Sequence, residues 1–268
     1  MTMFAIDCHA HIYMKKMASK AVKGVGEFYD VPMSCTGISE ELHEIAVSSP
    51  VRHFVVNVVA PSAKHVHRLN VFAAEECAAH SEFTGLATLH PDMENPDEEI
   101  EAILALGLKG IKLHPDTQHF DADSDKAMRL YECIAGRLPL LIHCGDYRYD
   151  SSHPRRIARI IEAFPELTVV AAHFGGWSIY DEAIPYLTDK NCYMDISSAM
   201  PFLPPEKIHS LIRHYGAERL MFGSDYPMWD PVREYEAFMK LDLTEQEREL
   251  ILRKNAAKVF SIDVSALG

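Results

Sequence analysis

The feature that most constrains the fold is a regular alternation of short apolar segments with helical segments along all 268 residues. Eight segments read as strands, because they are rich in apolar and β-branched residues and are flanked by turn residues. A helical segment follows each strand, and after the first the strands recur at intervals of about 25 to 30 residues. Strands that alternate with helices pair in parallel through crossover connections. The expected strands are residues 4–12, 54–60, 83–90, 108–114, 138–144, 167–174, 193–197 and 219–225.

Eight strand–helix units predict an α/β fold, the (β/α)8 TIM barrel, in which parallel strands close into a cylinder surrounded by helices. A doubly wound open sheet is the alternative, but no Gly-x-Gly-x-x-Gly phosphate loop follows the first strand. No linker or second domain is evident, and 48% of the residues are hydrophobic, which is enough for one extensive core. We therefore expect a single domain over residues 1–268, with its metal site at the C-terminal ends of the strands.

The formal net charge of −13 argues against two classes of partner. A surface this acidic repels phosphate backbones and anionic lipid heads, so we expect no nucleic acid and no membrane partner. No apolar run reaches the ~20 residues of a spanning helix. A strand begins by residue 4, and the six scattered cysteines form no Cys-x-x-Cys pair. These features predict a cytoplasmic protein that binds a small-molecule substrate, and they leave a homodimer open.

Polar residues occupy the strand ends, where this kind of barrel forms its site. In the first strand Asp7, His9 and His11 alternate with apolar residues, so both imidazoles point the same way. A barrel interior otherwise takes Val, Ile and Leu, and a buried charge without a partner costs several kcal/mol. Converging imidazoles and carboxylates remove that cost by binding a cation. The strand-end residues are His9, His11, His90, Lys112, His114, His143, His173, Asp195 and Asp225.

Short motifs around these residues resemble those of the amidohydrolase superfamily, and the resemblance spans nearly the whole chain. The Gly-Ile-Lys-Leu-His-Pro and Gly-Ser-Asp-Tyr-Pro strings are most similar to the amidohydrolase-related branch that includes aminocarboxymuconate-semialdehyde decarboxylase. The motifs are Asp7-Cys8-His9-Ala10-His11, Gly110-Ile111-Lys112-Leu113-His114-Pro115, Leu141-Ile142-His143, Ala172-His173-Phe174-Gly175-Gly176 and Phe222-Gly223-Ser224-Asp225-Tyr226-Pro227.

The resemblance implies that His9, His11, His143 and Asp225 bind one divalent ion, zinc above all. It also implies that His173 is the catalytic acid/base beside the metal-bound water. The residue chemistry agrees with these roles, because zinc at an open site lowers the pKa of its water to about 7. Asp225 would then accept that water's proton, and His173 would polarise a substrate carbonyl or protonate the leaving group.

Lys112 leaves the number of metal ions open. In binuclear members of the superfamily a carboxylated lysine on the fourth strand bridges two ions, and His173 would then bind the second. Lys112 and His114 share the parity that faces the barrel interior, so they belong either to a second metal site or to the substrate pocket. The branch that this chain most resembles usually holds one metal. We therefore expect one zinc ion, with a second as the alternative.

Substrate-binding residues are expected in the loops that follow the strands. Residues 13–36 read as a long connection, and loops of that length often form lids or binding loops. Arg148 is the best-placed cation for a substrate carboxylate, since a guanidinium binds that group bidentately. Trp177, Tyr180 and Trp229 are either pocket walls or loop packing.

Three classes of function follow from these residues. The first is a metal-dependent hydrolase of a small amide, lactone or ester, which we place slightly ahead. The second is a metal-dependent non-oxidative decarboxylase of an unsaturated or aromatic carboxylic acid. The third is a binding protein on an inactive enzyme scaffold, which is disfavoured because every expected metal ligand is present. The first two share the same metal site, so the sequence barely separates them.

Overall fold

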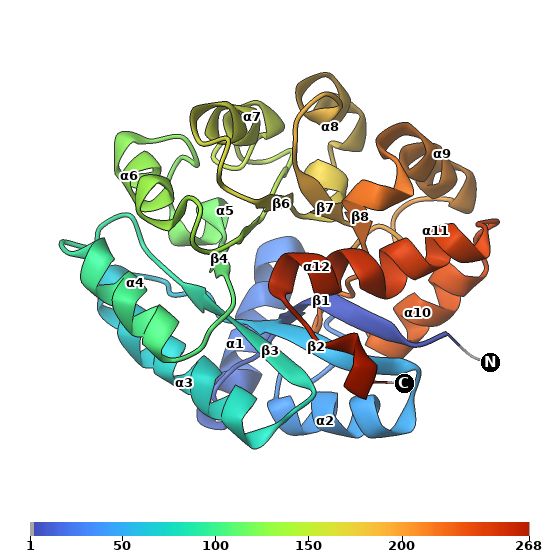
Figure 1. Ribbon diagram of the computed structural model, residues 1–268, viewed down its shortest axis with the longest axis horizontal. Helices are drawn as coiled ribbons and strands as arrows, with labels where there is room; N and C mark the ends of the chain where they lie inside the picture. Colours follow the sequence, from blue (N-terminus) through green and yellow to red (C-terminus); the bar gives the residue numbers. More distant parts are fainter. Residues whose placement is uncertain (1–2, 268) are drawn as a thin grey trace. The chain divides into compact units, whose positions relative to one another are not determined.

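The computed structural model describes residues 3–267, in which strands and helices alternate along the chain (Figure 1). The eight strands belong to one sheet in the order β1 to β8, so each strand neighbours the next one in sequence. The pairs β1 with β2 and β4 with β5 are parallel, as are β3 with β4, β5 with β6 and β6 with β7. The strands are β1 (Ala5–His11), β2 (Val51–Asn57), β3 (Phe83–Thr88), β4 (Ile111–Leu113), β5 (Leu140–Ile142), β6 (Val169–Ala171), β7 (Tyr193–Asp195) and β8 (Leu220–Met221).

At least one helix follows every strand, which completes the (β/α)8 fold predicted from the sequence. None of the helices within residues 3–267 is long and apolar enough to cross a membrane. A π-helical segment, Leu250–Lys254, joins the last two α-helices. The α-helices are α1 (Lys15–Tyr29), α2 (Ser39–Ser48), α3 (Val66–Ala79), α4 (Pro96–Ala105), α5 (Pro115–Gln118), α6 (Asp125–Ile134), α7 (Pro154–Ala163), α8 (Tyr180–Leu187), α9 (Pro205–Tyr215), α10 (Pro231–Met239), α11 (Glu245–Glu249) and α12 (Asn255–Phe260).

Strands β4 to β6 are shorter than expected, and they end just before the polar residues of interest. Strand β4 ends at Leu113, one residue before His114, and β5 ends at Ile142, one residue before His143. The predicted strands included these histidines, because a pattern of alternating residues does not show where the backbone turns out of the sheet. The histidines therefore lie on the turns that follow the strands.

Backbone contacts divide the described chain into two compact units. The first unit contains Glu75–Thr84 together with the described residues before Val58 and after Asp195. The second unit contains Val58–Ala74 and Gly85–Asp195. The single domain over residues 1–268 stays a prediction.

In the first unit, β1 lies beside β2 and also beside the segment that follows β8 (Figure 1). His11 pairs with Asn57 at the carboxyl end of β2. On the other side, the Cys8 N–H donates to the Phe222 carbonyl at 2.9 Å and the His11 N–H to the Tyr226 carbonyl at 2.7 Å. Main-chain hydrogen bonds on both sides thus fix the end of β1 that carries the histidines.

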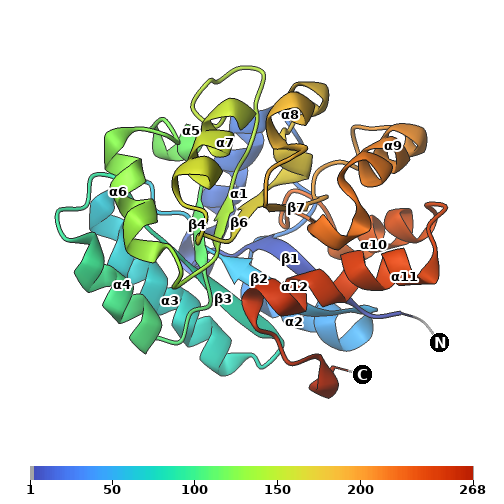
Figure 2. The same ribbon diagram turned by 45° about the horizontal axis from the view of Figure 1, so that its top comes forward.

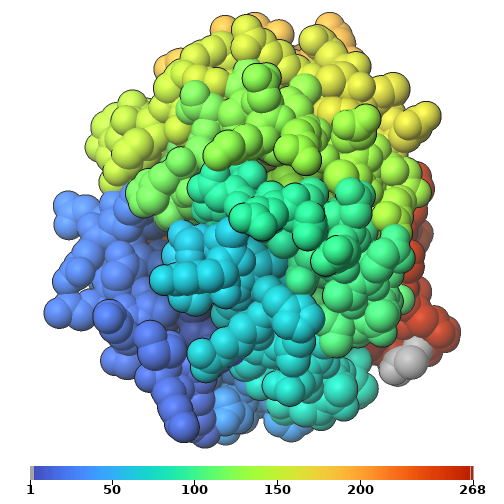
Figure 3. Space-filling view, turned by 90° about the vertical axis from the view of Figure 1, so that its left-hand side faces the viewer, coloured from blue at the N-terminus to red at the C-terminus, as the bar shows by residue number. Residues whose placement is uncertain are grey.

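In the second unit, strands β4 to β6 are fully buried and, apart from Lys112, apolar, and helices α6, α7 and α8 lie outside them (Figure 2). Ile111 is opposite Leu140, which is opposite Val169, and all three are completely buried. The outer helices are also joined by hydrogen bonds. Asn70 of α3 donates to the buried Glu99 carboxylate of α4 at 2.8 Å, beneath the face of the molecule that Figure 3 shows, where the two helices lie side by side.

The expected long connection over residues 13–36 is wrong, because Lys15–Tyr29 form helix α1. Gly24 and Gly26 suggested a loop. A glycine inside a helix costs only about 1 kcal/mol relative to alanine, however, and the Lys, Ala, Met and Glu residues of this segment favour a helix. The chain that remains for a loop is therefore short.

Candidate functional site

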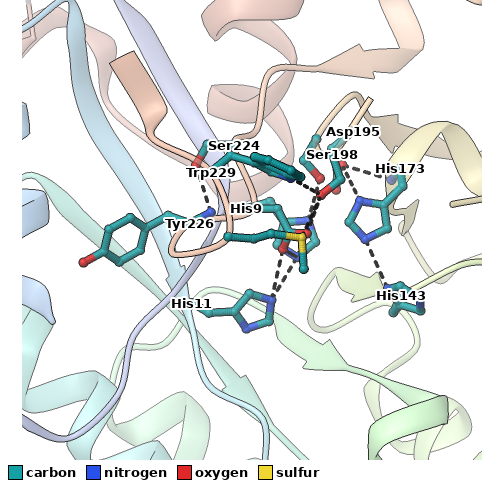
Figure 4. A network of polar contacts seen from close by, with 12 residues as sticks. His9, His11, His143, His173, Asp195, Ser198, Ser224, Tyr226 and Trp229 are labelled. Carbon is teal, nitrogen blue, oxygen red and sulfur yellow. Dashed lines mark hydrogen bonds and ion pairs between the residues drawn. The ribbon is translucent and has the colours of Figure 1, made fainter. Parts of the chain in front are cut away.

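His9 and His11 lie at the carboxyl end of β1 and point to the same side of it (Figure 4). Residues two apart on a strand share a face, and the Nε2 atoms of these two rings are 3.2 Å apart. His9 is buried, and 14% of the His11 side chain is exposed. The Nε2 atoms of the two rings thus face the same small region of the site.

Asp225 reaches the same point from the segment that follows β8. Its main-chain N–H donates to the His9 carbonyl at 2.9 Å. Its carboxylate Oδ1 lies 3.6 Å from Nε2 of His9 and 3.6 Å from Nε2 of His11. Gly223 allows this close approach, because a Cβ atom there would lie only 3.0 Å from the Cβ of His9.

These three atoms have the spacing of ligands around one metal ion. Metal–nitrogen and metal–oxygen bonds of about 2.0–2.1 Å in a tetrahedral zinc site place neighbouring ligand atoms about 3.4 Å apart. The observed separations are 3.2, 3.6 and 3.6 Å. Imidazole and carboxylate donors suit divalent transition metals. The residues present therefore fit a divalent ion.

Two serines orient these ligand atoms. The Oγ atom of Ser197 lies 3.1 Å from Nδ1 of His9, where it can accept the Nδ1 proton in the tautomer that keeps the lone pair on Nε2. Ser198 donates from its hydroxyl to Oδ2 of Asp225 at 2.6 Å, and the Trp229 indole N–H donates to that hydroxyl at 3.0 Å (Figure 4). Both side chains are thus held in orientations that suit metal binding.

Asp7 joins β1 to the segment after β8 through three hydrogen bonds. Its fully buried carboxylate accepts from the main-chain N–H groups of His9 and Ser224, each at 3.0 Å, and from the Ser224 hydroxyl at 2.5 Å. Burial raises the pKa of Asp7 to about 6, although these hydrogen bonds act in the opposite direction. Asp7 is therefore a positioning group for the ligand His9.

Aromatic side chains border this cluster in the first unit. Trp229 is linked to Asp225 through Ser198, and Phe202 packs edge-to-face on Trp229 with ring centroids 5.5 Å apart. Phe202 is 46% exposed. Burial and, to a smaller extent, the negative charge of Asp225 raise the pKa of Tyr13. Tyr13 is therefore close enough to Asp225 for the two side chains to interact electrostatically. A planar apolar border therefore accompanies the charged ligands.

In the second unit, His143 and His173 contact each other (Figure 4). Nδ1 of His143 lies 3.1 Å from Nε2 of His173, and Nε2 of His143 lies 2.9 Å from the Gly145 carbonyl. A carbonyl only accepts hydrogen bonds, so Nε2 of His143 carries the proton and Nδ1 keeps the lone pair. His173 is then the donor in the pair, and Nδ1 is the metal-binding atom that His143 offers.

Two neighbours orient the His143 ring, and Ser152 holds one of them. His114 stacks on it, with ring centroids 3.9 Å apart and planes inclined by 8°. Oδ2 of Asp116 lies 3.5 Å from Nε2 of His143 and accepts from the Ser152 hydroxyl at 2.6 Å. Burial raises the pKa of Asp116 to about 6. Buried carboxylates close to a ligating histidine fix its ring and raise its basicity.

The turn after β6 presents His173. The residue has a φ of 59°, in the left-handed region that non-glycine residues seldom adopt. Its main-chain N–H donates at 3.0 Å to the fully buried Asp195 carboxylate, at the end of β7, and its Nδ1 lies 4.0 Å from the same oxygen. Asp195 thus compensates for an unusual backbone conformation at a residue expected to transfer protons.

Arg148 is held in place by Asp146. Its Nε and Nη2 atoms donate to the two carboxylate oxygens at 2.9 and 2.7 Å, and its guanidinium carbon lies 5.9 Å from the centre of the Trp177 ring. The cation predicted to bind a carboxylate is therefore rigid, but Asp146 offsets part of its charge.

The predicted site residues fall into one cluster per unit. His9, His11 and Asp225 converge in the first unit, whereas His114, His143 and His173 converge in the second. Lys112 is completely buried on β4, where its strand neighbours are Thr88 and Leu141.

Sequence reasoning missed the side chains that support these residues. Ser197, Ser198 and Asp116 orient His9, Asp225 and His143, respectively. Each lies two or three residues beyond a strand-end residue that had been singled out, and that proximity is the only signal that could have found them.

A protein-family model with the description "amidohydrolase" matches residues 6–262. No curated protein matches the chain in sequence.

Solved structures share the fold at low sequence identity. The 5-carboxyvanillate decarboxylase from Sphingomonas paucimobilis is 18% identical and has a TM-score of 0.73, over 98% of this chain and 100% of that chain. A dihydroxybenzoic acid decarboxylase from Polaromonas sp. JS666, with bound manganese and the inhibitor 2-nitroresorcinol, is 15% identical and has a TM-score of 0.75, over 97% of each chain. A probable 2-pyrone-4,6-dicarboxylic acid hydrolase from Acinetobacter baumannii is 16% identical and has a TM-score of 0.70, over 97% of this chain and 100% of that chain.

Proposed function

The chain belongs to the amidohydrolase family, and we propose that it is a metal-dependent, non-oxidative decarboxylase of an aromatic or unsaturated carboxylic acid. As a member of this family it is a metal-dependent enzyme, either a hydrolase or a carboxy-lyase. The sequence placed the hydrolase first. The similar structures named above are mainly decarboxylases, which supports the alternative better.

The observation that carries this proposal is the aromatic border beside the ligand cluster of the first unit. Trp229 shares the Ser198 hydroxyl with Asp225, so its ring is held close to the carboxylate that binds the metal. An aromatic ring stacked on Trp229 or Phe202 gains about 0.5–1.5 kcal/mol beyond the area it buries. Oxygen substituents on such a ring would then face His9 and His11. A planar, oxygen-substituted acid is the substrate class that this arrangement favours.

We assign His9, His11 and Asp225 as three ligands of one divalent ion. His143 is the fourth ligand that the sequence predicts, and Nδ1 is its donor atom. When bound, the ion polarises a substrate oxygen and offsets the negative charge that develops as the bond to the carboxylate breaks. Zinc is the expected metal, and manganese is the alternative because a similar decarboxylase holds it.

The reaction consumes one proton per turnover. The bond between the ring carbon and the carboxylate breaks, its electron pair stays on the carbon, the carbon takes a proton, and carbon dioxide leaves. We assign delivery of that proton to Nε2 of His173, which carries a proton in its pair with His143 and would turn it toward the substrate once Nδ1 of His143 binds the ion. Asp225, with Oδ2 fixed by Ser198, would accept a proton from a substrate hydroxyl or a water.

Two further cations have proposed roles. Arg148 binds a substrate carboxylate, and its contact with Asp146 keeps the guanidinium in one orientation before the substrate arrives. Lys112 is completely buried, and we assign it as a fixed positive charge in a site with one metal.

The test follows the carboxyl carbon of the substrate and the hydrogen that replaces it. The metal-loaded enzyme is incubated in heavy water with carboxyl-labelled 2,6-dihydroxybenzoate and 5-carboxyvanillate, the acids named for two similar decarboxylases, within a panel of aromatic and unsaturated acids. We expect labelled carbon dioxide and an equal amount of product with one deuterium at the former carboxyl carbon. A parallel incubation with 2-pyrone-4,6-dicarboxylate in oxygen-18 water reports hydrolysis.

Four variants accompany this assay. Trp229→Ala should raise the KM for the aromatic acid, whereas Trp229→Phe should keep the KM close to the natural value. His67→Ala, on the exposed face of α3, should keep the natural rate. Metal analysis that finds two ions, both lost in Lys112→Ala, would establish the two-metal alternative. Oxygen-18 in the pyrone product, with no carbon dioxide from any acid of the panel, would replace the decarboxylase by the hydrolase.

A further inference from the structure

A second cluster of metal-ligating side chains lies in the first unit, away from the β1 histidines. It consists of His43 in α2 together with His80 and Glu82 in the turn between α3 and β3 (Figure 1). Oε1 of Glu82 lies 2.5 Å from Nδ1 of His43 and 3.4 Å from Nδ1 of His80. The two imidazole rings are 5.0 Å apart between centroids. Two imidazoles thus converge on one carboxylate oxygen.

This cluster is separate from the candidate metal centre. The Glu82 carbonyl accepts from the Phe54 N–H at 2.9 Å, whereas His11 pairs with Asn57 at the far end of β2. Three residues of strand, about 10 Å, separate Phe54 from Asn57. One ion therefore does not bind to both groups.

The cluster is largely preformed. The His80 and Glu82 side chains are only 19% and 15% exposed, and the Phe83 N–H donates to the His80 carbonyl at 3.1 Å, which fixes the turn. Their separation of 3.4 Å equals the distance of about 3.4 Å between neighbouring ligands of a tetrahedral zinc-type ion. The His43 side chain is 46% exposed, so it has room to retreat by about 1 Å and complete the set.

The carboxylate is available as an anionic ligand. Burial, the largest single influence, raises the pKa of Glu82, but the hydrogen bond from His43, a main-chain hydrogen bond and the charges of His43 and His80 together lower it overall. A partly buried anion with two imidazoles beside it offers one oxygen and two nitrogen lone pairs once both rings are neutral.

We propose that His43, His80 and Glu82 bind a divalent transition-metal ion such as zinc or nickel. Two imidazoles and one carboxylate are the donors that such ions prefer. The ion would link α2 to the turn between α3 and β3, two segments that are distant in sequence, and so stabilise the native state. Three protein ligands leave the remaining coordination positions to water on the exposed side of His43.

The test titrates the enzyme, with its catalytic metal already bound, with additional zinc and separately with nickel. Calorimetry measures the bound equivalents, and thermal unfolding measures the shift in Tm. We expect one further equivalent and, at metal concentrations about 100-fold above Kd, a rise in Tm of about 5 to 10 °C. His43→Ala and His80→Ala should each lose both effects.

His67→Ala is the matched control, because Nδ1 of His67 lies 3.1 Å from the Glu99 carboxylate in a histidine–glutamate pair without a second histidine. It should keep the extra equivalent and the shift in Tm. The proposal is overturned if the natural protein binds no further metal at micromolar concentrations. It is also overturned if His43→Ala and His80→Ala bind the same extra equivalent as the natural protein, because the cluster would then be only a set of ion pairs.

Discussion

Asp7 offers the sharpest test of how the β1 histidines are positioned, because two substitutions there separate its charge from its hydrogen bonds. Asp7→Asn removes the charge but keeps an oxygen that can accept from the main-chain N–H groups of His9 and Ser224. Asp7→Ala removes both the charge and the acceptor. The two variants therefore share the electrostatic change and differ in the hydrogen bonds.

The buried charge of Asp7 destabilises the native state, whereas its hydrogen bonds stabilise it. Burial raises the pKa of Asp7 from 3.8 to about 6, so the stability present below pH 3.8 is lost as the pH rises through 6. The difference of about two units between the two pKa values lowers the free energy of unfolding by ~3 kcal/mol at neutral pH in the metal-free protein. The neutral side chain in Asp7→Asn does not have this cost of burying a charge. Its hydrogen bonds are only weaker, because the acceptor is no longer charged. Asp7→Ala leaves two buried N–H groups without an acceptor, at about 1–3 kcal/mol each.

In the metal-free protein, Asp7→Ala should therefore be less stable than Asp7→Asn by about 2–6 kcal/mol, whereas Asp7→Asn should be at least as stable as the natural protein. Urea unfolding at pH 7, after chelation, measures the free energies. Both variants should bind the metal more weakly, because a negative charge next to the cation is lost. Equal stability of the two variants within 0.5 kcal/mol, about the error of such measurements, would refute the view that Asp7 acts through the His9 and Ser224 N–H groups.

Two further predictions concern single groups. Asp225→Asn should lower turnover by at least ~100-fold, because an amide does not accept a proton and is a poor ligand; near-normal turnover, with metal content measured on the same sample, would remove both roles. His53 is buried, its Nδ1 has no hydrogen-bond partner among residues 3–267, and burial lowers its pKa to about 4. The neutral ring is therefore favoured in the native state. The free energy of unfolding falls as the pH drops from 6.5 toward 4, because the unfolded state binds the proton more readily than the native state. Compared with His53→Gln, the natural protein should lose about 2–3 kcal/mol more between pH 7 and 4.5 in urea unfolding, and parallel losses would contradict the assignment.

The fold could be predicted from the sequence because each strand–helix unit carries its own local signals. Branched apolar runs mark the strands, and polar residues at their ends mark the site. The failure at residues 13–36 has a local cause as well. Gly24 and Gly26 disfavour a helix by their intrinsic propensity, but each costs a helix only about 1 kcal/mol, which packing along one face of α1 outweighs.

The candidate site could be predicted only in part. His9 and His11 are two residues apart, and the period of a strand is sufficient to place both rings on one face. The contact of Ser197 with His9 joins residues 188 positions apart, and the contact of Ser198 with Asp225 depends on where the chain turns after β7. No periodic pattern encodes such contacts. The aromatic border, on which the proposed substrate class rests, depends on the same long-range placement.

The two units use the same device to position a functional histidine. Asp7 in the first unit and Asp195 in the second are completely buried, and each accepts the main-chain N–H of a histidine at 3.0 Å, His9 and His173 respectively. A carboxylate that accepts the main-chain N–H fixes the backbone of the histidine and leaves Nε2 of its ring for chemistry. This explains why a buried aspartate accompanies each histidine without being needed as a ligand. It also distinguishes two kinds of carboxylate in the site, because the Asp225 oxygens contact the side chains of His9, His11 and Ser198, whereas Asp7 and Asp195 each also accept a main-chain N–H.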